Sequence, residues 1–208
     1  DATSNEAVIN GTLKLNDYLV VDWILGEEGP SSSSFDIEEQ IKVTSFLKNG
    51  GRLFVSGSEI GYDLVEKGNQ YDKDFYYKIL KANYLSDAPA GKQGVYDITG
   101  VSGTIFDNIF FSFDNGTMGT YDVDWPDGIK PALNAESILR FNGIDYNTKG
   151  GAGVAYRGRF LDSPNPGALI YLTIGFETIF PEEKRFEIMN RIVEYLEGPI
   201  ASTNNDSF

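Results

Sequence analysis

The chain of 208 residues is 41% hydrophobic and 23% charged, and it carries a formal net charge of −14. This size and composition are typical of a globular protein with one sizeable core and one domain. The negative charge excludes nucleic-acid binding, because no basic stripe can neutralise phosphates, and no apolar run approaches the ~20 residues that span a bilayer. Cys and His are absent, which excludes Cys–His and Ser–His–Asp catalysis and zinc sites made of those residues.

The first third of the chain predicts a strand, a helix and a second strand. Residues 7–9 are a candidate short strand, and the nearly continuous apolar run 18–25 predicts a strand covered on both faces of a parallel sheet. Asp36 and Glu39 have the spacing of a capping box, so a helix is expected to begin there and to end at a Gly pair. Residues 53–55 form the next strand, and this order predicts a right-handed βαβ unit.

A glycine-bounded turn follows the second strand. Gly57-Ser58-Glu59-Ile60-Gly61 has the G-x-nucleophile-x-G spacing of a strand-to-helix elbow, which exposes one side chain above an α/β sheet. The glycines are expected because the turn is tight and the next helix packs close behind it. Glu59 stands where acyl-transfer enzymes carry Ser or Cys.

The remaining elements are less regular. A second amphipathic helix is expected over residues 72–84, and residues 85–150 are expected to be a β-rich insertion or cap. Segments 137–141 and 153–157 predict an antiparallel pair near the sheet edge.

The end of the chain again predicts regular secondary structure. A buried strand is expected over 168–174, and a last helix is expected from Pro181, with Phe186 among its apolar residues. We therefore predict one domain over residues 1–198 and a disordered tail or linker over 199–208.

Several of these segments together resemble the class I glutamine amidotransferase-like superfamily, including its ThuA-like branch. The resemblance rests on residues 4–8, on 17–18 leading into 23–27, and on 50–61 and 174–179, with Arg185 and Met189 in the last helix. It covers most of residues 1–198, weakly across 85–150, and is closest to domains of large secreted bacterial proteins described as xanthan lyase-like or as hydrolases. It implies an α/β fold of the three-layer, flavodoxin-like type, with a mainly parallel sheet, an irregular β-rich insertion and a missing first βα unit.

The resemblance also implies where a site would lie. Active members carry Cys on the elbow, His and Glu after a late strand, and an oxyanion loop after an earlier strand. By position these fall on Glu59, on Gly175 to Glu177 and on Gly26 to Pro30. Because neither Cys nor His is present, glutamine hydrolysis by that mechanism is excluded.

Four acids follow strand C-termini, where ligands bind in open α/β sheets: Glu27, Glu28, Glu59 and Glu177. Three interpretations stay open. The acids belong to a degenerate site and bond to backbone amides, or they are the paired carboxylates of a hydrolase, or they bind Ca²⁺ or Mg²⁺. Ser58 is a candidate nucleophile that would need a base such as Lys67.

Two other features are candidate binding elements. Asp122, Asp124 and Asp127 are clustered like calcium-loop acids, although Pro126 breaks the EF-hand pattern. Tyr62 and Trp125 are aromatic side chains suited to stacking on sugars.

We predict a catalytically degenerate module of a secreted or periplasmic bacterial protein that handles carbohydrate, with a binding or scaffolding role beside other domains. The carbohydrate context comes from the resemblance. The alternative is a glycan hydrolase that uses Glu59 and Glu177. No cofactor is expected apart from Ca²⁺ or Mg²⁺.

Overall fold

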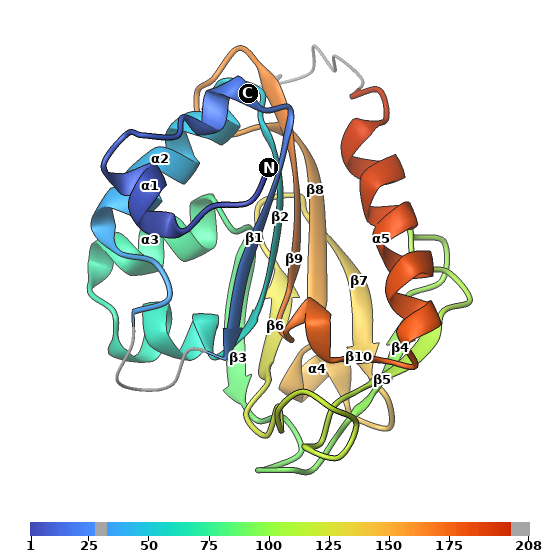
Figure 1. The fold of residues 1–208 in the computed structure, drawn as a ribbon. Coiled ribbons are helices and arrows are strands. Elements are labelled where there is room, and N and C mark those ends of the chain that lie inside the picture. Colours follow the sequence, from blue (N-terminus) through green and yellow to red (C-terminus); the bar gives the residue numbers. More distant parts are fainter. Residues whose placement is uncertain (28–32, 201–208) are drawn as a thin grey trace.

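The computed structural model describes residues 1–27 and 33–200 as a curled, half-barrel-like sheet with helices on both sides (Figure 1). The eight strands of this sheet run in the order β1-β2-β9-β8-β7-β4-β5-β10. They are β1 (Val20–Glu27), β2 (Arg52–Ser58), β4 (Asp97–Gly100), β5 (Phe110–Phe113), β7 (Glu136–Phe141), β8 (Gly153–Arg159), β9 (Pro166–Leu172) and β10 (Ile179–Phe180). A separate two-stranded sheet pairs β3 (Ala82–Asp87) with β6 (Asp127–Pro131).

The helices are short apart from two. They are α1 (Asn5–Ile9), α2 (Ile37–Lys48), α3 (Gln70–Lys78), α4 (Tyr146–Lys149) and α5 (Glu182–Glu197), with single turns at η1 (Leu15–Asp17), η2 (Tyr62–Lys67, a π-helix) and η3 (Phe176–Thr178). Helices α1, α2 and α3 lie on one side of the sheet and α5 on the other (Figure 1). Among the described residues, no helix is long and apolar enough to cross a membrane.

The predicted βαβ unit is confirmed. Strands β1 and β2 pair in parallel, with Val20 beside Arg52 and Trp23 beside Val55. The expected capping box starts α2, where the Asp36 N–H donates to a Glu39 carboxylate oxygen at 2.7 Å. Residues 7–9, expected as a strand, belong instead to α1.

The flavodoxin-like expectation is wrong, because most of the sheet is antiparallel. In the described chain, the β1–β2 and β2–β9 pairings are parallel, whereas every pairing from β9 through β8, β7, β4 and β5 to β10 is antiparallel. Residues 85–150 supply β4, β5 and β7 to this sheet. The molecule is therefore a β-rich fold with a mixed sheet and not a three-layer, mainly parallel one.

Several other predicted elements differ in part from the structure. The second helix ends at Lys78, and residues expected to continue it form β3, which pairs with β6. The pair 137–141 and 153–157 is antiparallel as predicted, but it lies inside the sheet. The last helix forms as expected, and its Phe186 side chain is 69% exposed.

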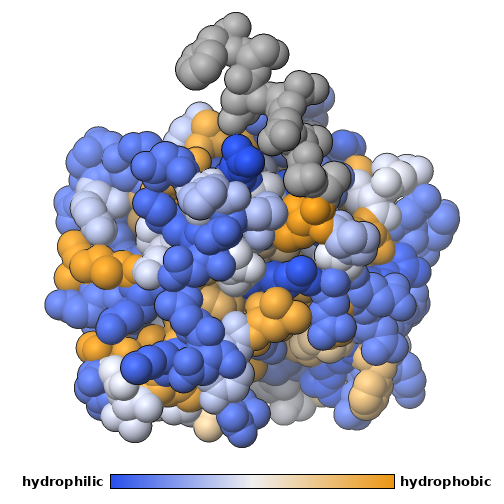
Figure 2. All heavy atoms as spheres, turned by 90° about the horizontal axis from the view of Figure 1, so that it is seen from above, coloured by the Kyte–Doolittle hydropathy of each residue, from blue (hydrophilic) through white to orange (hydrophobic). Residues whose placement is uncertain are grey.

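Two hydrophobic clusters cover the two faces of the sheet, and β2 contributes to both. Leu53 and Val55 belong to the cluster under α2 and α3, whereas Phe54 belongs to the cluster that includes Ile188 and Ile192 of α5. This alternation explains the continuous apolar run of β2. Seen from above, the surface is mainly hydrophilic, and its hydrophobic residues form separate patches (Figure 2).

Candidate functional site

The two parallel strands β1 and β2 end side by side and bring predicted site residues together. The sheet register pairs Glu27, the last residue of β1, with Ser58, the last residue of β2, and Glu59 follows directly. The negative charges that act on Glu59 come from Asp87, Glu27 and Asp124, and the buried Asp127 senses Asp87 and Glu59. We call this group the acidic end; it consists of Glu27, Glu59, Asp87, Asp124 and Asp127.

The sharp turn predicted at Glu59 is present. Glu59 has φ of 60°, a left-handed conformation that is costly for a residue with a side chain. A Cβ on Gly61 would lie 2.6 Å from the Tyr76 hydroxyl and 2.7 Å from the Tyr84 ring. Only glycine therefore fits where the following helix meets α3 and β3, as the elbow pattern predicts.

Glu59 is half-buried and its pKa is raised to about 7. Partial burial is the largest cause, and the charges of Asp87, Glu27 and Asp124 add to it, while Lys67 acts in the opposite direction. Near neutral pH this carboxyl group therefore exchanges between a protonated and an ionised form.

Asp127 caps the turn that carries Glu59. Its side chain is fully buried, and one oxygen accepts the Gly61 N–H at 2.6 Å. Burial, as the largest cause, raises the pKa of Asp127 to about 8, although the backbone N–H groups of Gly61 and Tyr62 favour its ionised form. Its other oxygen has no hydrogen-bond partner among the described residues. The residue predicted as a metal ligand thus fixes the elbow.

The other two candidate metal ligands have separate partners. Asp122 accepts hydrogen bonds from Gln93 at 2.6 Å and from the Tyr96 hydroxyl at 2.5 Å. Asp124 forms an ion pair with Lys92 at 3.1 Å. Within residues 1–27 and 33–200, no group of three or more acidic side chains is arranged to hold a metal ion. The Ca²⁺ or Mg²⁺ site stays a prediction that this arrangement does not favour.

Glu177 lies in η3 after β9 and belongs to a different set of contacts. The Tyr121 hydroxyl donates to Oε1 of Glu177 at 2.5 Å, and this oxygen is 3.4 Å from where a Cβ on Gly26 would be. Arg185 donates to the Glu177 backbone carbonyl at 2.7 Å. Tyr121 carried no signal in the sequence, because it lies in an irregular loop 56 residues away.

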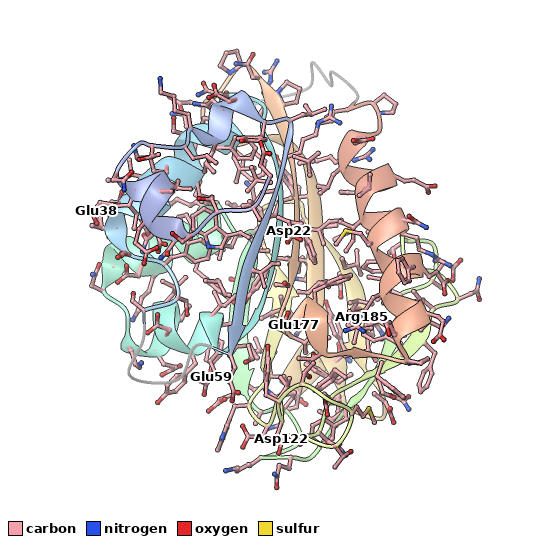
Figure 3. All side chains as sticks on the ribbon, viewed as in Figure 1. Asp22, Glu38, Glu59, Asp122, Glu177 and Arg185 are labelled. Carbon is pink, nitrogen blue, oxygen red and sulfur yellow. The ribbon has the colours of Figure 1, made fainter. Side chains whose placement is uncertain are left out.

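Glu59 and Glu177, the predicted pair, act on different neighbouring carboxyl groups. The charges that shift Glu59 do not include Glu177, which acts instead on Asp22 of β1. Figure 3 shows Glu59 at the lower edge of the sheet and Glu177 nearer to its centre, beside Arg185.

The remaining predicted residues lie as follows. Ser58 is 1% exposed, and Lys67, its proposed base, is paired with Asp63 at 3.3 Å, so the arrangement does not favour a nucleophilic serine. Tyr62 and Trp125 are half-buried, with lysine ammonium groups 5.8 Å and 6.0 Å from their respective ring centroids. Glu27 is exposed and burial raises its pKa. Glu28 lies outside the described residues.

Comparisons with known proteins find similarity in fold but not in sequence. No family model and no curated protein matches the chain. A β-galactosidase from Bacillus circulans sp. alkalophilus aligns with a TM-score of 0.52 and 13% identity, over 88% of this chain and 23% of the enzyme. The cold-adapted β-galactosidase from Rahnella sp. R3 aligns with a TM-score of 0.53 and 11% identity, over 90% and 24%.

A third similar structure is the mmIFT52 N-terminal domain, with a TM-score of 0.54 and 13% identity over 94% of this chain and 81% of that one. The chain thus spans about a quarter of the length of the β-galactosidases. The amidotransferase-like and ThuA-like assignments find no support in these matches. At these identities the similarity establishes a shared fold.

Proposed function

We propose that the chain is a carbohydrate-associated module of a larger protein, which binds sugar at the acidic end and acts as a binding or scaffolding unit without covalent catalysis. The secreted or periplasmic location expected from the sequence remains part of this proposal. The single observation that carries it is the state of Glu59.

A half-buried carboxyl group with a pKa of about 7 is suited to sugar hydroxyls. When protonated it donates one hydrogen bond and accepts others, and when ionised it accepts several. Exposed Glu27 and half-buried Asp87 add acceptors beside it, and the ring of Tyr62 lies in the turn that follows. Convergent carboxyl groups and an aromatic face are what hydroxyl-rich ligands with apolar C–H faces need.

The sugar class is supported by the two structures named as β-galactosidases, in which a segment of this fold occurs within a much longer chain. Galactose-containing oligosaccharides are therefore the first ligands to test. The same observation supports a role beside other domains.

A hydrolase is the second candidate, because a glutamate with a pKa near 7 is suited to act as a general acid. Among the described residues, the acids whose charges act on Glu59 are Glu27, Asp87 and Asp124, and they join the predicted Glu177 as candidates for its second carboxylate. Retaining and inverting glycosidases both require such a pair.

Calorimetric titration with lactose tests the proposal, and hydrolysis of a chromogenic β-galactoside is measured in parallel. We expect binding with a Kd of about 1 mM or tighter and no turnover. Glu59→Gln should weaken binding at least about threefold, the loss of one hydrogen bond to a ligand. Glu38→Gln is the matched control, because Glu38 is an exposed acid on α2, away from the acidic end (Figure 3).

The outcomes separate the candidates. Turnover that disappears in Glu59→Gln and persists in Glu38→Gln would replace the binding module with a hydrolase. Absence of lactose binding at tens of millimolar, a concentration well above about 1 mM, would overturn the carbohydrate proposal.

A further inference from the structure

The outer edge of β1 is open. In the described chain β1 pairs with β2 alone, and it is the first strand in the sheet order. The Leu19 carbonyl accepts from the Arg52 N–H at 3.1 Å, so the backbone groups of Val20, Asp22 and Ile24 point away from β2, because alternate residues of a strand face opposite sides. No hydrogen bond from the described residues reaches these outward groups.

This edge lacks most of the devices that usually protect edge strands. Residues 20–24 contain neither Pro nor Lys, and the register irregularity of β1 comes after Ile24. The Ile24 side chain is 60% exposed. Open edges of this kind are templates for an added strand.

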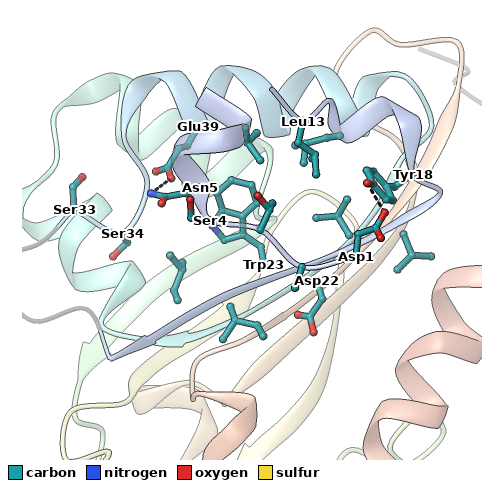
Figure 4. Close-up of a pocket in the computed structure, with 18 residues that line it drawn as sticks. Asp1, Ser4, Asn5, Leu13, Tyr18, Asp22, Trp23, Ser33, Ser34 and Glu39 are labelled. Atoms are coloured by element: carbon teal, nitrogen blue, oxygen red, sulfur yellow. Dashed lines mark hydrogen bonds between the residues drawn. The ribbon is translucent and has the colours of Figure 1, made fainter. Parts of the chain in front are cut away.

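A groove of about 590 Å³ runs along the same edge (Figure 4). The N-terminal segment 1–5, β1 and the start of α2 bound it, and the nearly buried Trp23 lies on its helix side. Two hydrogen bonds hold the N-terminal wall: Tyr18 donates to Asp1 at 2.9 Å, and Asn5 donates to Glu39 at 2.8 Å.

The charge of the groove defines what fits into it. The acidic side chains that line it are Asp1, Asp22 and Glu39, and no Lys or Arg is among its lining residues. Although Asp22 keeps contact with solvent, loss of hydration and the charge of Glu177 raise its pKa to about 6. A cation opposite Asp22 would offset both effects.

We propose that the open edge of β1 binds an extended segment of a partner protein, which adds as a strand and carries a basic residue between two apolar ones in the pattern apolar-x-basic-x-apolar. Val20, Asp22 and Ile24 occupy alternate positions on one face, so the facing residues of an added strand follow the same spacing in either direction. Backbone hydrogen bonds would supply affinity, and the side chains at Asp22 and Ile24 would supply selectivity.

A second copy of this chain fits the groove less well. Pairing two β1 edges about a two-fold axis would bring two acidic grooves together, and like charges opposite each other in a sheet are destabilising. The inference does not depend on the sugar proposal, because the groove and the acidic end use different residues, apart from the strand they share.

Two synthetic peptides test the proposal, acetyl-SVTKTVS-amide and its counterpart with Glu in place of Lys. The titration follows the backbone amide signals of the full chain by NMR. We expect the signals of Val20, Asp22 and Ile24 to shift with the Lys peptide, which should bind about three- to tenfold tighter than the Glu peptide. Asp22→Lys should reverse this preference, whereas Glu38→Lys, the same charge change on exposed α2, should leave it unchanged.

A second variant tests the backbone contribution. Ile24→Pro removes an outward N–H without touching the β2 pairing, so it should abolish binding while the thermal midpoint stays within a few degrees of the parent. Peptide-induced shifts that miss β1 at ~1 mM peptide, or equal effects of Asp22→Lys and Glu38→Lys, would overturn the proposal. Sedimentation would detect self-association of the chain. If self-association occurs and Ile24→Pro abolishes it, a second copy of the chain binds the β1 edge and the proposal is overturned.

Discussion

Asp127 offers the sharpest test of how the acidic end is built. Replacing it with Asn keeps an oxygen that accepts from the Gly61 N–H group, and it removes the ionisable group. Replacing it with Ala removes the acceptor as well. The two variants therefore separate the hydrogen bonds from the charge.

The side-chain oxygen of Asp127 should contribute measurably to the free energy of unfolding. A buried N–H without a partner costs roughly 1–3 kcal/mol, so losing the acceptor of the Gly61 N–H should make the Ala variant less stable than the Asn variant by about 1–3 kcal/mol. This difference is expected at every pH, because neither variant titrates at this position.

The ionisation of Asp127 makes the free energy of unfolding depend on pH. The pKa of Asp127 is about 8 in the folded chain, above its ordinary value of 3.8, so the folded state holds a proton that the unfolded state has released. The stability of the parent should therefore fall as the pH rises from about 4 to about 8, and it should be flat above that range. The Asp127→Asn variant does not lose stability in this way. The difference in free energy of unfolding between this variant and the parent should therefore grow, as the pH rises, by an amount on the order of a few kcal/mol.

Urea unfolding of the three proteins at about pH 5 and about pH 9 measures both quantities. A difference between the parent and Asp127→Asn that does not change with pH would show that Asp127 does not titrate as described. Equal stabilities of the Asn and Ala variants would show that the Gly61 N–H group does not depend on this side chain.

Three further predictions concern the same region. Tyr121→Phe removes the donor to Glu177 and should lower the free energy of unfolding by about 1–2 kcal/mol. Glu177→Gln keeps an acceptor and should lower it by less in the same urea titration. The reverse order would contradict the hydrogen bond between these two side chains. Gly61→Ala places a methyl group 2.6 Å from the Tyr76 hydroxyl and should lower the free energy of unfolding by about 1–3 kcal/mol, so an unchanged thermal midpoint would refute the close packing. The carboxyl carbon of Glu59, followed by NMR, should titrate at about pH 7, and Asp87→Asn should move the midpoint lower because it removes a negative charge; an unchanged midpoint would exclude that coupling.

Local signals in the sequence predicted the elements that form locally. The capping box of Asp36 and Glu39 placed the start of α2, and the glycine spacing placed the turn at Glu59. Strand β2 was visible because both of its faces are covered. These features depend on neighbouring residues, so a single sequence is enough to find them.

The sheet topology depends on distant residues and was not predictable in the same way. Strands β4 and β5 have four residues each, too few for a distinct pattern, and their pairing with each other and with β7 makes the sheet antiparallel. Lys78 ends α3 because the following residues pair with β6, about 45 residues further along.

Some residues of the candidate site are positioned by local sequence, and others are positioned by distant segments. Glu27 and Glu59 were found because strand ends and elbows are local features. Asp127 was assigned to a calcium loop from its neighbours in sequence, whereas the β3–β6 pairing buries it against the elbow. The contact between Tyr121 and Glu177 joins two segments that no local pattern relates.

A crystal structure of the chain soaked with lactose at about its Kd tests the carbohydrate proposal. We expect density for an intact disaccharide at the acidic end, with sugar hydroxyls within hydrogen-bond distance of Glu59 and Glu27, and lower occupancy in a Glu59→Gln crystal soaked at the same concentration. Cleaved sugar at this position would identify a hydrolase, and an acidic end without sugar, or sugar bound elsewhere, would contradict sugar binding at the acidic end.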